Sequence, residues 1–339
     1  MSSPGVSRRI DPRRAAFVAV GFALSAAGLW YVFHDVDAAA LLGSAERVRF
    51  LPLLGSLACY WAGLVLLRSV LVSHLLRSVG EVSVGQAYRY ICIGFLANNV
   101  LPFRAGDVAR SVAIHRGSGI RFPSVVGSLA VERVLDMMMV AAIGLAAIQV
   151  APLPAGIRVA ALVSGGALVA ALGVLTVLAR RSRAEKDEIG GRWRAGIWNL
   201  WVRFSAGFGA LGTVRGILFA LLLAVLIWTL ALATMAFRLA AFDLEPSLPV
   251  VLALLASLGF GVAVPSAPGY VGTYHAAAAF ALQLFGVESG VAAAYGLFSW
   301  IVDIGASSLA GGICLPIEGL RLAELRRGAS AGPSGERGG

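Results

Sequence analysis

Long apolar stretches recur along this chain, and they limit what it can fold into more than any other feature. A stretch of about 20 mostly apolar residues is long enough to cross the hydrocarbon core of a bilayer as a helix. Of the 339 residues, 58% are hydrophobic and 14% are charged, whereas soluble domains have roughly 25% charged residues. We therefore predict an all-α, polytopic membrane protein.

Basic residues predict how the spans are oriented. The net charge of +10 would suggest nucleic acid in a soluble protein, but here the arginines gather at the ends of apolar stretches, as the positive-inside rule describes. We expect no nucleic-acid partner, a location in the cell (inner or cytoplasmic) membrane, and cytoplasmic N- and C-termini. Arg68 and Arg77 are expected in a cytoplasmic loop. The predicted full spans are residues 15–33, 50–67, 123–150, 156–179, 217–241 and 290–317.

Two polar segments interrupt the apolar pattern. Residues 98–110 contain one proline and one glycine, and residues 264–275 contain two of each. A helix interior does not tolerate Pro and Gly at this density, so both segments are predicted to be unwound. In a bilayer, unwound backbone is tolerated only where protein buries it or water reaches it.

The order of spans and breaks predicts two inverted repeats. Each half has a span, a Pro/Gly-broken re-entrant hairpin and a further span; the first half (about 50–150) begins outside and the second (about 217–317) begins inside. Matching breaks in two halves indicate a transporter-type binding site. Residues 1–327 then form one membrane domain, and 328–339 a disordered tail. In an alternative topology each hairpin is a pair of full spans, because residues 248–264 are almost long enough to cross.

Ionised residues in apolar surroundings are the main candidates for function, since each costs roughly 2.5–3.5 kcal/mol at a helix centre. Glu132 and Asp136 share a helix face, and Arg133 lies between them. Together with Arg104, Asp107 and Arg110 of the first break, these residues give three positive and three negative charges. These charged residues could form an ion network that holds the hairpin to the neighbouring span, or they could contact a ligand. For Glu132, Arg133 and Asp136 we favour the ion network. For Arg104 we favour ligand contact, because a guanidinium on a turn is a natural bidentate partner of phosphate.

The second break offers backbone donors instead of charge. A half-helix that begins near Gly272 would point its positive N-terminus at the site and attract anions. Simple kinks at Pro265 and Pro268 are the alternative. Asp303, in the last span, is either a packed carboxylate or a proton carrier. The predicted head-group-binding residues are Asn98, Asn99, Arg104, Asp107, Arg110, Glu132, Arg133, Asp136, Gly269, Gly272, Tyr274 and His275, and the candidates for proton coupling are Asp303, His275 and Glu132.

Motifs for catalysis, nucleotide binding and metal binding are missing from the sequence. There is no P-loop, no His-Glu-x-x-His and no Gly-x-Ser-x-Gly, and the three cysteines lack metal-ligand spacing. We therefore expect no catalytic residues, no cofactor and no metal.

Three segments together resemble the flippase-like membrane family that includes the transmembrane region of lysylphosphatidylglycerol synthase. They are residues 99–110, 132–136 and 265–272, and their order and spacing agree over roughly residues 15–317. Asp107 stands where the family usually has glutamate, and His275 near a usually acidic position. The sequence has no counterpart of the soluble aminoacyl-transfer domain, so the resemblance does not imply lysyl-lipid synthesis. It implies movement of an anionic or glycosylated lipid between leaflets.

The predicted function is therefore a lipid flippase or transporter whose partner is a membrane phospholipid or glycolipid. Two alternatives from other classes remain. One is a membrane enzyme that modifies a lipid-linked head group, with Glu132 or Asp136 as the base. The other is a membrane partner of a glycosyltransferase. A homo-oligomer or an association with a lipid-biosynthesis enzyme is also expected.

Overall fold

The computed structural model describes residues 12–37, 46–101, 106–150, 206–263 and 266–320, with isolated positions at 41, 43, 44, 155, 159, 162, 163, 166 and 204. All regular structure in these residues is helical, with no strand. Most of the predicted span at 156–179 and the predicted tail at 328–339 lie outside the described residues.

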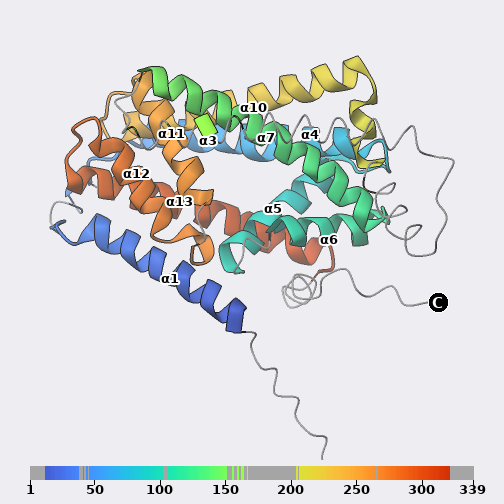
Figure 1. Cartoon of the computed structure of the whole chain (residues 1–339), viewed down its shortest axis with the longest axis horizontal. Helices are drawn as coiled ribbons and strands as arrows, with labels where there is room; N and C mark the ends of the chain where they lie inside the picture. Colours follow the sequence, from blue (N-terminus) through green and yellow to red (C-terminus); the bar gives the residue numbers. More distant parts are fainter. Residues whose placement is uncertain are drawn as a thin grey trace, which may run out of the picture.

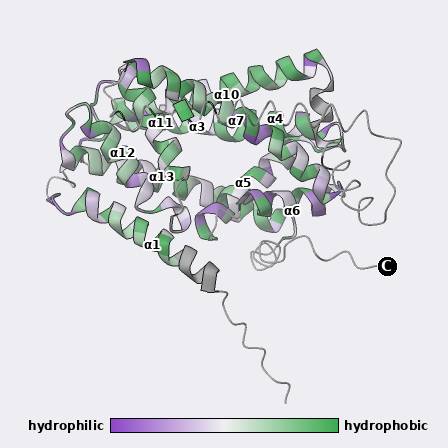
Figure 2. Cartoon of the chain, in the orientation of Figure 1, coloured by the Kyte–Doolittle hydropathy of each residue, from purple (hydrophilic) through white to green (hydrophobic). Residues whose placement is uncertain are grey.

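Three helices are long and apolar enough to cross a membrane. The first has 27 residues and consists of α3 (Phe50–Tyr60), the π-helical η1 (Trp61–Leu67) and α4 (Arg68–Leu76). The other two are α10 (Val214–Ala241), with 28 residues, and α13 (Ser289–Ile317), with 29. Most of their residues are hydrophobic, as the colouring in Figure 2 shows, and many of their large apolar side chains are exposed. This composition is that of a helical membrane protein.

Two further helices complete the long elements of the bundle. α7 (Phe122–Val150) has 29 residues and carries three charged side chains near its middle, Glu132, Arg133 and Asp136. α1 (Pro12–Phe33) packs mainly against the later part of the chain and lies at the edge of the bundle in Figure 1. The observed bounds of these helices agree with the predicted spans 123–150 and 15–33 to within a few residues.

Apart from the 3₁₀ helix η3 (Gly207–Gly212), the remaining helices are short and come in two pairs, each interrupted where the sequence predicts a break. α5 (Val84–Val100) begins at a capping box of Ser83 and Gln86, and α6 (Gly106–Ser118) follows it after the first break. In the second pair, α11 (Leu248–Ala263) is followed by the 3₁₀ turn η4 (Pro268–Tyr270) and by α12 (Thr273–Gln283). Neither helix continues through its break, but both breaks are shorter than predicted, because residues 98–100, 106–110 and 273–275 are helical.

The two short pairs lie toward opposite ends of the bundle (Figure 1). At one end, Arg89 at the start of α5 forms an ion pair with Glu318, just after α13. At the other end, Arg49 before α3 pairs with Asp243 after α10 at 2.8 Å. The interrupted tips of the pairs therefore point toward the middle of the bundle.

The expected position of Arg68 is wrong. The helix does not end at residue 67 but continues to Leu76, and Arg68 is 6% exposed inside the bundle. An arginine is tolerated there because two carboxylates of α7 lie within hydrogen-bond distance of its guanidinium, as described below.

Candidate functional site

The tip of the first helix pair is held together by two adjacent asparagines. The Gly106 backbone N–H donates to Asn98 Oδ1 at 2.8 Å, so Asn98 caps α6 across the break. Asn99 Nδ2 donates to the hydroxyls of Ser307 and Ser308 on α13 at 3.0 and 2.9 Å. A side chain on Gly106 would collide with Asn98, so only glycine permits this close approach.

The tip of the second pair is held by backbone hydrogen bonds to neighbouring helices. Gly269 and Gly272 have φ of 70° and 83°, which glycine adopts without strain. Trp300 Nε1 on α13 donates to the Gly269 carbonyl at 2.6 Å, and the Ala267 N–H donates to Ser25 Oγ on α1 at 2.8 Å. Both tips are thus fixed to α13, which determines their spacing.

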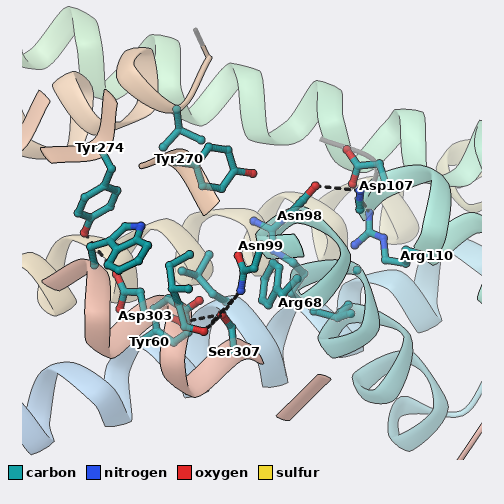
Figure 3. Close-up of a pocket in the computed structure, with 18 of the residues that line it drawn as sticks. Tyr60, Arg68, Asn98, Asn99, Asp107, Arg110, Tyr270, Tyr274, Asp303 and Ser307 are labelled. Carbon is teal, nitrogen blue, oxygen red and sulfur yellow. Dashed lines mark hydrogen bonds and ion pairs between the residues drawn. The ribbon is translucent and has the colours of Figure 1, made fainter. Parts of the chain in front are cut away.

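A cavity of about 380 Å³ lies between the two tips (Figure 3). The first pair lines it through both asparagines and Asp107, the second pair through Tyr270 and Tyr274. Long helices supply the other walls, with Tyr60, Leu64, Arg68, Arg133, Trp300, Asp303, Ile304 and Ser307. The volume is at the lower end of the range for ligand pockets, which suits one head group better than a whole lipid.

An ion network borders the cavity on the side of the first pair. Arg68 NH1 contacts Glu132 at 2.6 Å and Asp136 at 2.8 Å, joining α4 to α7. Arg110 on α6 donates to Glu132 Oε2 at 2.8 Å. Glu132 is fully buried and is therefore held between two arginines.

The same network reaches the cavity through Arg133. Its guanidinium contacts Asp107 at 2.7 Å and Asp136 at 3.1 Å, and so joins the α6 tip to α7. Trp228 Nε1 on α10 donates a further hydrogen bond to Asp136 at 3.2 Å. These contacts match the ion-network interpretation of Glu132, Arg133 and Asp136.

A second buried ion pair borders the other side of the cavity. Arg238 on α10 is fully buried and contacts both carboxylate oxygens of Asp303 on α13 at 2.8 Å. The Tyr274 hydroxyl donates to the same carboxylate at 3.4 Å. Asp303 is therefore a hydrogen-bonded carboxylate whose side chain still reaches the cavity.

The predicted site residues fall into three groups in the structure. Asn98, Asn99, Asp107, Arg110, Arg133 and Tyr274 line the cavity, as does the proton-coupling candidate Asp303. Glu132, Asp136, Gly269, Gly272 and His275 lie behind these residues, in the ion network or the second tip. Arg104 lies outside the described residues.

Two of the three proton-coupling candidates are shielded from the cavity. Glu132 is fully buried between arginines, and His275 is 2% exposed and accepts the Gly272 N–H at Nδ1. The burial of Glu132 also argues against its acting as a base on a substrate in the cavity. Asp303 is the candidate that a ligand in the cavity could reach.

Sequence reasoning missed several residues that line or border the cavity. Arg68 and Arg238 each lie within an apolar stretch, and the cost of an unpaired charge there could have identified them. The aromatic residues gave no such pattern, because Trp and Tyr at a cavity look the same in sequence as Trp and Tyr at a membrane interface. The aromatic cavity residues that sequence reasoning missed are Tyr60, Tyr270 and Trp300.

Comparison with known proteins agrees with this architecture. No curated protein matches the chain. A family described as the lysylphosphatidylglycerol synthase TM region matches residues 18–311, which include all or most of each long helix, both interrupted pairs and the cavity. The match confirms the suspected resemblance and indicates a membrane protein tied to lipid handling. The chain therefore belongs to the family of the lysylphosphatidylglycerol synthase transmembrane region.

Proposed function

We propose that the protein is a flippase, or head-group transporter, that moves an anionic or glycosylated lipid between membrane leaflets. The observation that carries the proposal is the cavity between two interrupted helix tips, inside a bundle whose long helices expose many large apolar side chains. A lipid head group would enter the cavity while its tails stay in the bilayer. Interrupted helices that border a polar cavity are the arrangement found in transporters.

Helix length supports the view that both short pairs are re-entrant. α6 has 13 residues and α12 has 11. At 1.5 Å per residue they measure roughly 20 and 17 Å, too short for a hydrocarbon core of about 30 Å. A pair of full spans would need longer second helices. Each pair would then enter the membrane and return to the same face.

Equivalent ion pairs support an inverted repeat. α7 and α13 both have 29 residues, and Asp136 and Asp303 are the central residues of these helices. Arg68, from the first long helix of the first half, holds Asp136 with both terminal nitrogens, and Arg238 holds Asp303 in the same way in the second half. The repeats would be residues 50–150 and 217–317, within one membrane domain.

Helix packing has the symmetry that such a repeat requires. The first long helices of the two halves, α3 and α10, pack against each other. α5 of the first half packs on α13, and α11 of the second half packs on α7. Exchanging the halves leaves this set of contacts unchanged. Two related halves around one central site are the basis of alternating access.

Charge at the two ends of the bundle supports the orientation. The end with the loops after α4 and α6 carries Arg77, Arg116 and Arg121. The opposite end carries Arg47 and Arg49 before α3, together with Asp243, Glu245 and Glu288. The positive-inside rule makes the first end cytoplasmic. We therefore place the membrane domain in the cell membrane with both termini inside.

Arg104 is the residue to which we assign the lipid phosphate. The four arginines around the cavity are all paired with carboxylates, so none carries unbalanced charge within the described residues. Arg104 lies between α5 and α6 in the sequence, and in this proposal it would add one positive charge to the balanced set. Transport would be driven by a lipid gradient or by proton movement at Asp303.

Reconstitution tests the proposal. Vesicles carrying a trace of tail-labelled phosphatidylglycerol are treated with an impermeant quencher, and the loss of inner-leaflet signal gives the transfer rate. We expect the protein to accelerate transfer and Arg104→Ala to slow it roughly ten- to hundred-fold, because a charged hydrogen bond contributes about 1.5–3 kcal/mol. Arg104→Lys should be intermediate, since it keeps the charge but loses the bidentate fork.

Arg121→Ala is the matched control, because it removes an exposed arginine away from the cavity and should leave the rate unchanged. Parent protein that does not accelerate transfer would overturn the flippase proposal. Equal rates for the parent and Arg104→Ala would overturn the role of Arg104 alone.

A further inference from the structure

The cavity has a pair of neutral amide groups that the fold uses only in part. Asn98 Oδ1 accepts a hydrogen bond from the Gly106 N–H, and its Nδ2 remains available as a donor. Asn99 Nδ2 donates hydrogen bonds to Ser307 and Ser308, and its Oδ1 remains available as an acceptor. Within the described part of the chain neither of these remaining atoms has a hydrogen-bond partner, and both residues line the cavity (Figure 3). One tip thus presents a donor and an acceptor side by side.

The groups around this pair offer ring surface and hydroxyls. Tyr60, Tyr270 and Trp300 line the same cavity, and Figure 3 shows Tyr270 across from Asn98. Tyr270 has φ of 58°, a conformation that bulky residues rarely adopt and that recurs at ligand clamps. Its backbone is thus held in an uncommon conformation beside the cavity.

The chemistry of the remaining atoms distinguishes between classes of head group. A phosphate offers acceptors and an ammonium group offers donors, so each can satisfy only one member of a donor–acceptor pair. A hydroxyl is donor and acceptor at once, and two neighbouring hydroxyls satisfy both members. The paired charges around the cavity also leave no described carboxylate free to balance an ammonium group.

We infer that the head group carries neighbouring hydroxyls, as a sugar or polyol does, and that Asn98 and Asn99 select it. This inference rests on the proposed function and names the substrate class of the same site. The cavity of about 380 Å³ accommodates one such group. The hydroxyls of the head group would bind the amide pair.

The test compares two lipids that differ only in these hydroxyls. Phosphatidylglycerol has two neighbouring hydroxyls, and phosphatidylpropanol has none but carries the same charge and tails. With tail-labelled forms in separate vesicles, we expect the parent protein to move phosphatidylglycerol at least five- to ten-fold faster. This factor corresponds to about one neutral hydrogen bond.

Asn98→Asp is the informative variant. It keeps an oxygen that caps Gly106, so the tip should fold as before, but it replaces the cavity-facing donor with an acceptor. The rate ratio of the two lipids should fall toward one. A general effect of the added negative charge would slow both lipids equally and leave the ratio unchanged.

Gln86→Glu is the matched control. Gln86 also uses its side-chain oxygen to accept a backbone N–H, from Ser83, and it lies on the same helix at the far end from the cavity. The variant adds the same charge by the same amide-to-carboxylate change. It should keep the parent ratio.

Lipid retention during purification, measured by native mass spectrometry from an equal mixture of the two lipids, decides the inference independently of transport. Preferential retention of phosphatidylglycerol that Asn98→Asp abolishes supports it. Equal retention, or equal transfer rates for the two lipids in the parent, overturns it and leaves the flippase proposal standing. Preferential retention without any transfer overturns the flippase proposal instead.

Discussion

Arg238 and Asp303 carry opposite charges deep in the bundle, so each depends on the other. The guanidinium is fully buried, and both of its terminal nitrogens contact the carboxylate at 2.8 Å. Removing one member of a buried ion pair leaves an unpaired charge and costs about 3–5 kcal/mol, whereas replacing both with apolar groups is often neutral. Losing one member of the pair is therefore expected to destabilise the protein much more than replacing both members with apolar residues.

This balance gives a prediction for single and double variants. Arg238→Met should lower the melting temperature of the purified protein in detergent by roughly 5–10 °C. Asp303→Leu in the same chain should restore most of the loss. Arg49→Met is the control, since its partner Asp243 is 70% exposed and such surface pairs contribute about 0–1 kcal/mol. A double variant no more stable than Arg238→Met would contradict the argument.

Among the elements, α1 has a specific contact that sequence analysis did not anticipate. It packs against the second tip, where Gly28 lies beside Gly272 and the Ala267 N–H donates to Ser25. A Cβ on Gly28 would lie 2.7 Å from the Gly272 carbonyl oxygen. The first helix therefore supports the backbone of the tip.

Gly28→Ala should push α1 away from the tip and destabilise the protein by roughly 1–3 kcal/mol, as overpacked contacts do. Thermal unfolding in detergent measures the change. Gly305→Ala on α13 is the comparison, because no neighbouring atom lies within 4 Å of the point that its added methyl group would occupy, and alanine favours the helix by about 0.5–1 kcal/mol. Equal stability of the two variants would show that α1 does not pack closely on the tip.

For the whole molecule, the central question is the depth of the two tips. The short α6 and α12 favour tips that stop inside the membrane, approached from opposite faces. Full-length pairs would instead carry each tip across to the far surface. In both topologies the loops lie on the same sides of the membrane, so only the depth of the tips distinguishes the two.

Single-cysteine labelling in a background without Cys59, Cys92 and Cys314 measures this depth. A bulky, impermeant maleimide should reach Ser118→Cys only from the cytoplasm and Glu288→Cys only from outside. Val100→Cys, at the end of α5, should react with it from neither side. Labelling of Val100→Cys from outside would mean that α5 and α6 are full spans.

Most of the helical framework could be predicted from the sequence, because its causes are local. Apolar length determines which segments can span, and Pro and Gly end helices wherever they occur, so the ends of α5 and α11 agree with the predicted breaks. Asn98, Asn99, Asp107 and Tyr274 of the breaks were likewise named as candidate site residues. These features need no knowledge of what lies beside them.

Tertiary structure alone decided which of these groups meet. Arg68 and Asp136 are 68 residues apart, and Arg238 and Asp303 are 65 apart, yet both pairs are in contact because the long helices pack side by side. Trp300 faces the cavity only because α13 lies against both tips. Packing between distant segments determines which residues pair with buried charges and which residues line a cavity. The hydropathy pattern along the chain does not predict that packing.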